Sequence, residues 1–213
     1  MAILDMAAAK AQKAQLKRGK DADQKAAIDY LIPSGGLLGL LFDKKDEEYD
    51  ALLNKLIDSF GSYKRAINKI GLDEDELKEI PPVTLVGYEF EKATLSRTGK
   101  DNITRTNLYS ITHLFFSSTQ VYMYNVVLDT TSNTKKERTE EYFYRDITNF
   151  STSSESFDVE IPAGCLGSGF KKVPLEVQQF GLIVPGDKFT CSTYGDIEAQ
   201  VRAMKNKLRE KKA

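Results

Sequence analysis

The chain has 213 residues, 41% of them hydrophobic and 29% charged, which is enough to bury the core of one or two domains. Its formal net charge is -1, whereas a nucleic-acid-binding domain usually carries a marked basic excess. Two cysteines are too few for a disulfide framework, and no apolar leader is visible near the N-terminus. We therefore expect a cytoplasmic protein that does not bind nucleic acid.

The first part of the chain has a helical pattern. Residues 1–27 are rich in Ala, Lys and Gln with little apolar stripe, which predicts a solvated helix or a mobile arm. The segment Asp46–Phe60 is the clearest helix, because its apolar residues recur at the spacing of one helical face. These residues are Tyr49, Leu52, Leu53, Leu56, Ile57 and Phe60.

Two shorter helices are predicted before a proline pair. Ser62 can cap a helix that ends at Gly71, a residue suited to a left-handed stop. Asp73 and Glu76 resemble a capping box that opens a third helix through Ile80. Prolines 81 and 82 forbid continuation, so we place a helical N-terminal region at residues 1–80 and a second domain at 81–213.

Beyond the prolines the sequence favours strands, because it is rich in Thr, Val, Tyr and Phe and is divided by turn-forming residues. The candidate strands are Val83–Glu91, Asn107–Phe116, Gln120–Asp129, Arg138–Ser151, Ser156–Ile161, Val173–Val184 and Lys188–Thr193.

One of these strands changes its alternation. Apolar side chains occupy the odd positions from 173 to 177 and the even positions from 180 to 184. This flip around Gln179 predicts a bulge or a bend. Pro185, Gly186 and Asp187 then predict a hairpin turn.

The chain ends in a predicted amphipathic helix that starts near Asp196. Its apolar residues share one face, and lysines and arginines occupy the rest. The apolar residues are Ile197, Val201, Met204 and Leu208.

This order of elements, several strands and then one amphipathic helix, resembles that of the bacterial PH-like domain family. The segments Leu108–Phe116, Glu140–Ile147 and Ala199–Lys212 resemble strands and the terminal helix of such domains, and the likeness covers roughly residues 83–212. The resemblance implies an α+β protein in which a PH-like antiparallel β-barrel of about seven strands is closed by the C-terminal helix.

Four basic residues surround the first expected hairpin and are candidates for binding an anion or a lipid headgroup. They are Lys92, Arg97, Lys100 and Arg105. Their place resembles the part of PH domains that holds inositol phosphates. Two acidic residues, Glu91 and Asp101, lie among them, so a hairpin that is merely solvated is the alternative interpretation.

Catalytic patterns are missing from the sequence. His113 is the only histidine, and one histidine makes neither a nucleophile–base pair nor a metal site with Cys165 and Cys191. The glycine-rich segment 164–169 lacks the Lys-Ser/Thr and the following helix of a phosphate-binding loop. We expect no enzyme activity, no cofactor and no metal.

Two functions then remain in order of preference. The first is a non-catalytic module that binds a protein or peptide through a sheet edge or groove. The second is binding of anionic lipid headgroups through the first hairpin, with residues 37–42 as an apolar wedge. The oligomeric state stays open at this point.

Overall fold

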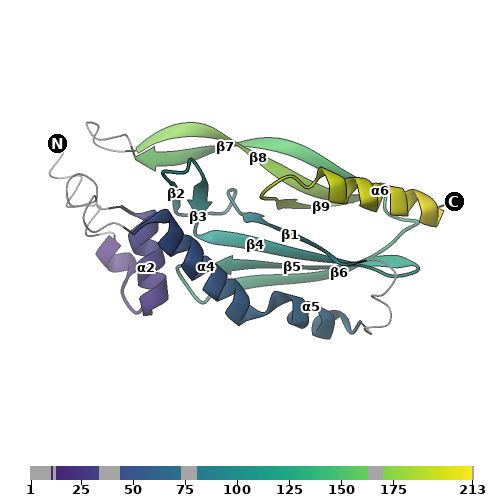
Figure 1. The fold of residues 1–213 in the computed structure, drawn as a ribbon, viewed down its shortest axis with the longest axis horizontal. Coiled ribbons are helices and arrows are strands. Elements are labelled where there is room, and N and C mark those ends of the chain that lie inside the picture. Colours follow the sequence, from purple (N-terminus) through teal and green to yellow (C-terminus); the bar gives the residue numbers. More distant parts are fainter. Residues whose placement is uncertain (1–10, 12, 34–43, 73–80, 163–169, 213) are drawn as a thin grey trace.

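The computed structural model describes residues 11, 13–33, 44–72, 81–162 and 170–212. Within these ranges it contains helices and antiparallel strands that end in a C-terminal helix (Figure 1), so the expectation of an α+β protein is confirmed. The helices are α2 (Ala22–Leu31), α4 (Asp46–Phe60), α5 (Ser62–Ile70) and α6 (Glu198–Lys212).

The strands form three hydrogen-bonded sheets in the described part of the chain. A four-stranded sheet has the order β1-β4-β5-β6, a small hairpin pairs β2 with β3, and a three-stranded sheet has the order β7-β8-β9. The bounds are β1 (Val83–Tyr88), β2 (Ser96–Thr98), β3 (Thr104–Thr106), β4 (Leu108–Phe116), β5 (Gln120–Asp129), β6 (Lys135–Phe143), β7 (Asn149–Pro162), β8 (Phe170–Val184) and β9 (Asp187–Ser192).

The sheets are not closed into a barrel. The three-stranded and four-stranded sheets are joined at one corner. There, Tyr194 N, just after β9, donates a hydrogen bond to Val86 O of β1 at 2.7 Å. Each sheet otherwise keeps its own ladder, so the expected barrel is not confirmed. The order of four strands, three strands and one helix nevertheless follows the predicted order of elements, with the β2–β3 hairpin inserted between β1 and β4.

The strand predicted at Arg138–Ser151 is wrong as a single element. It contains the end of β6 and the start of β7, separated by a turn in which Asp146 N donates to Phe143 O at 2.9 Å. The segment predicted at Ser156–Ile161 is a continuation of β7 rather than a strand of its own. The run of Tyr, Phe and Thr on both sides hides a turn that carries neither Gly nor Pro.

Of the bulge or bend predicted near Gln179, the bulge is wrong. The register of β7 with β8 is unbroken from Asn149↔Ile183 to Pro162↔Phe170. The apolar phase changes because β8 buries opposite faces in its two halves: Phe180 and Leu182 enter the core between the sheets, whereas Val177 faces the groove described below. The hairpin turn at Pro185–Gly186 is confirmed, with Gly186 at φ +83°.

Helix α2 is packed, although the sequence suggested that residues 1–27 form a solvated helix or an arm. Asp21 caps α2 in a capping box with Gln24. Ala27 and Tyr30 are fully buried, and Lys13 forms an ion pair with Asp29 at 3.0 Å. The apolar stripe is absent from the sequence because small and amphipathic side chains make these contacts. The helix predicted at 73–80 lies outside the described residues.

The four-stranded sheet separates two buried clusters. On one face, Leu114 and Met123 pack with the three-stranded sheet and α6. On the other face, Phe115 and Tyr124 pack with α2, α4 and α5. Strand β4 therefore buries both of its faces, and Figure 1 shows the resulting layers of helices, sheet, and sheet with helix. Because the helices share a cluster with this sheet, the division at residue 81 stays a prediction.

Candidate functional site

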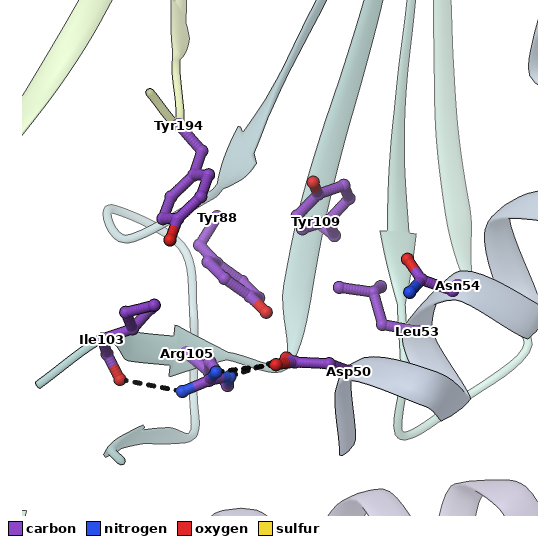
Figure 2. A pocket seen from close by; sticks show the side chains of 8 residues that line it. All are labelled: Asp50, Leu53, Asn54, Tyr88, Ile103, Arg105, Tyr109 and Tyr194. Carbon is purple, nitrogen blue, oxygen red and sulfur yellow. Dashed lines mark hydrogen bonds and ion pairs between the residues drawn. The ribbon is translucent and has the colours of Figure 1, made fainter. Parts of the chain in front are cut away.

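A groove lies between the end of β1, the β2–β3 hairpin, the first half of β8 and the residues after β9. Its volume is about 370 Å³. A second hollow of about 250 Å³ adjoins it and shares Tyr88, Ile103 and Tyr194 as walls (Figure 2). Leu175 and Val177 of β8 line the larger hollow. The two hollows together form a mainly apolar groove with tyrosine side chains around it, which we call the tyrosine groove.

The close approach of β1 to the end of β9 positions the tyrosines. A Cβ atom at Gly87 would lie 2.5 Å from Ser192 O, so only glycine allows this approach. Tyr88 follows and is 8% exposed, whereas Tyr194, whose backbone is bound to Val86, is 57% exposed. The backbone of Tyr194 is thus held by β1, while its aromatic ring is exposed to solvent.

The first half of β8 has an unpaired edge beside this groove. Strand β9 pairs with β8 only from Gln179 to Val184. Gln178 O accepts a hydrogen bond from Thr193 N at 2.8 Å on the β9 side. Because backbone groups of a strand point alternately to its two sides, the N–H and C=O of Lys172 and Glu176 point to this same side. Within the described residues no strand pairs with these backbone groups of Lys172 and Glu176.

The groove is acidic. Glu176 and Asp196 line the larger hollow, and Asp50 lines the smaller one next to Arg105. The only basic residue among the described lining residues is Arg105, and its charge is compensated by two carboxylates. A ligand that carries positive charge beside an apolar side chain matches this lining.

Arg105 is not available to a ligand, although the sequence made it a candidate anion-binding residue. It is 2% exposed and donates two hydrogen bonds of 2.7 Å to Asp50 of α4. Asp101 accepts two more, at 3.0 and 2.7 Å. The Arg105 guanidinium lowers the pKa of Asp101 to about 2, and the hydrogen bonds to both carboxylates keep Arg105 charged. Arg105 holds the hairpin to α4.

The other three basic residues each have a different neighbour. Arg97 donates to Tyr30 O at 2.8 Å and lies over the Tyr30 ring at 4.5 Å, so it fixes the hairpin to α2. The backbone N–H of Lys100 donates to Asp46 of α4 at 2.8 Å, and its side chain is exposed. Lys92 is exposed and lies 4.0 Å from Glu91. Two of the four candidates thus have structural partners.

His113 lies in the interior of β4 and is 3% exposed. Its two ring nitrogens are each 2.9 Å from a hydroxyl, those of Ser62 and Thr84. Burial lowers the pKa of His113 from 6.5 to about 4. The side chain is therefore neutral at physiological pH, and both of its nitrogens are used within the core.

This arrangement predicts a pH dependence of stability. The unfolded chain binds a proton at His113 below about pH 6.5, but the folded chain does so only near pH 4. We expect His113 to cost about 3 kcal/mol of unfolding free energy as pH falls from 6.5 to 4. Urea unfolding of the protein and of His113→Gln at pH 7.0, 5.5 and 4.5 measures this, because the difference between them isolates His113. An unchanged difference across the three pH values would contradict the assignment.

The cysteines offer no reactive site in the described residues. Cys191 is buried in the core between the sheets, and burial raises its pKa to about 12, which keeps the thiol protonated. Cys165 and the glycine-rich segment 164–169 lie outside the described residues, as does the apolar segment 37–42. No group of three or more potential metal ligands occurs in the described ranges.

No protein-family model, curated protein or solved structure matches this chain. In the described part of the chain, no helix is both long enough and apolar enough to cross a membrane.

Sequence reasoning missed the tyrosine groove. Its residues come from six separated segments, and Tyr88, Tyr109 and Tyr194 resemble ordinary strand residues. The change of apolar phase in β8 was the one local signal, because it marks the point at which the strand leaves the core and begins to line the groove.

Proposed function

We propose that the protein is a non-catalytic binding module that takes an extended segment of a partner protein into the tyrosine groove. The observation that carries the proposal is the unpaired edge of β8 beside an apolar hollow. An added strand would gain backbone hydrogen bonds to Lys172 and Glu176 and to the carbonyl of Pro174, which has no N–H, and its alternate side chains would enter the hollow. We also propose that the two sheets and α6 form a PH-like arrangement, which the order of four strands, three strands and one helix supports.

The lining defines the chemistry of this segment. Leu175, Val177 and Ile103 favour a bulky apolar side chain, and the exposed ring of Tyr194 can cover it. The carboxylates of Glu176 and Asp196 favour a Lys or Arg next to that side chain. The proposed ligand is therefore an extended peptide that combines an apolar or aromatic residue with flanking basic residues.

A library of fluorescent ten-residue peptides tests the proposal. Half of the peptides place Phe or Leu between lysines in a β-branched background, and the other half carry Glu in place of each Lys. We expect binding only in the basic half, and Tyr194→Ala to weaken it about tenfold, as loss of an aromatic anchor does. Glu176→Lys should weaken binding more at low salt than at high salt.

Matched variants serve as controls. Phe143→Ala removes another exposed aromatic ring, and Asp146→Lys reverses another exposed carboxylate; neither residue lines the tyrosine groove. Equal losses in the groove variants and in these controls would contradict the proposed site.

Binding of anionic lipid headgroups through the first hairpin is the second candidate function. The exposed Lys92 and Lys100 support it, but Arg97 and Arg105 are held by α2 and α4. Each basic residue near an anionic surface contributes about 1 kcal/mol, so two lysines give marginal affinity. Flotation with phosphatidylserine vesicles at physiological salt, lost in Lys92→Gln/Lys100→Gln, would place this function first.

A further inference from the structure

A third hollow, separate from the two that form the tyrosine groove, lies at the opposite end of α6 from that groove. Its volume is about 600 Å³, and its lining is the C-terminal half of α6 together with the first residues of β7. The lining residues are Thr148, Asn149, Lys205, Leu208, Arg209 and Lys212. Since a helix rises about 1.5 Å per residue, Leu208 in this hollow lies about 15 Å along α6 from the first helical residue, Glu198, which follows the groove residue Asp196.

Three cations meet in this hollow, and no carboxylate lines it. Lys205, Arg209 and Lys212 are spaced by four and three residues, so they share one face of α6. Within the described residues none of the three has a carboxylate partner, and Arg209 donates only to the Asn206 side chain at 3.3 Å. The nearby Glu210 pairs with Lys207 at 3.0 Å instead.

The helix C-terminus alone does not explain this arrangement. Carbonyl groups at the end of a helix favour cations on any of its faces. Here three of the six cations of α6 lie on the face that borders β7, where the Thr148 hydroxyl and the Asn149 amide add polar groups with no hydrogen-bond partner among the described residues. Leu208 is buried and forms an apolar floor beside the three charges.

We propose that this hollow binds a ligand with two or more linked phosphate groups. The three cations extend over about 10 Å of the helix, which is a longer span than a single phosphate can contact. Arg209 can chelate phosphate oxygens with two parallel hydrogen bonds, and the lysines act as point charges on either side. The site is independent of the tyrosine groove and of the first hairpin.

Calorimetric titration with inorganic triphosphate tests the proposal on the full chain. We expect binding at physiological salt, at least tenfold weaker in the variant Lys205→Gln/Arg209→Gln/Lys212→Gln. The control Lys25→Gln/Lys64→Gln/Lys136→Gln loses the same charge from exposed positions elsewhere and should change affinity less than twofold. Inorganic monophosphate should bind at least tenfold more weakly than triphosphate.

Vesicles distinguish a free ligand from a lipid source of the same chemistry. Flotation on vesicles that contain a bisphosphorylated inositol lipid, lost in the hollow variant and kept in the control, supports a membrane source. Triphosphate binding without such flotation supports a free ligand. Absence of both, or equal losses in the two triple variants, overturns the proposal. Thermal melts of each variant verify that it remains folded.

Discussion

Replacing Arg105 by methionine should lower the unfolding free energy by about 2–3 kcal/mol. Breaking a buried ion pair usually costs 3–5 kcal/mol, because one charge is left without its partner. Here the carboxylates of Asp50 and Asp101 are 42% and 38% exposed, so water can hydrate them and the cost falls below that range. At about 2–4 °C per kcal/mol, the melting temperature should fall by roughly 5–10 °C.

Lys100→Met is the matched control, because it removes a basic residue of the same hairpin whose side chain is exposed. Its effect on stability should stay within about 0.5 kcal/mol. Calorimetry of both variants provides the measurement. A melting temperature of Arg105→Met equal to that of Lys100→Met would show that the hairpin is not held by this ion pair.

Replacing Val201 by aspartate should destabilise the protein severely. Val201 is 3% exposed and packs in the core between the sheets, in the cluster that includes Met204 and Leu208. A carboxylate there loses its hydration without gaining a partner, which costs several kcal/mol. We expect a loss of about 4 kcal/mol or more in urea unfolding.

The neighbouring substitution Arg202→Asp introduces the same group on the exposed face of α6. It should cost less than about 1 kcal/mol, because an exposed carboxylate keeps its hydration. Comparable shifts for the two variants would mean that α6 does not seal the core as its apolar face indicates.

Elements with one clear periodicity were predictable. Helix α4, the strands β4 and β5, and the apolar face of α6 follow directly from their apolar spacing. Short elements were not: β2 and β3 have three residues each, and their sequences are polar. Their stability comes from contacts with helices that are more than forty residues away, such as Arg105 with Asp50.

The candidate site also depends on contacts between distant segments, which the sequence alone does not reveal. The four basic residues around the first hairpin suggested anion binding, because a sequence shows the charge of a side chain but not its partners. Asp46 and Asp50 belong to the polar positions of α4, and nothing local indicates that they face Arg105 and Lys100. The tyrosine groove depends on chain segments that only tertiary folding brings together, so its existence could not be read from spacing.

The attachment of the hairpin by Arg105 ties one wall of the tyrosine groove to a helix. Ile103 and Thr104 line the groove, and the adjoining Arg105 side chain is bound to α4. This wall is therefore positioned by a segment that lies more than fifty residues earlier in the chain and packs on the four-stranded sheet. A substitution in α4 that weakens the ion pair would disturb the groove as well as the packing of the helix.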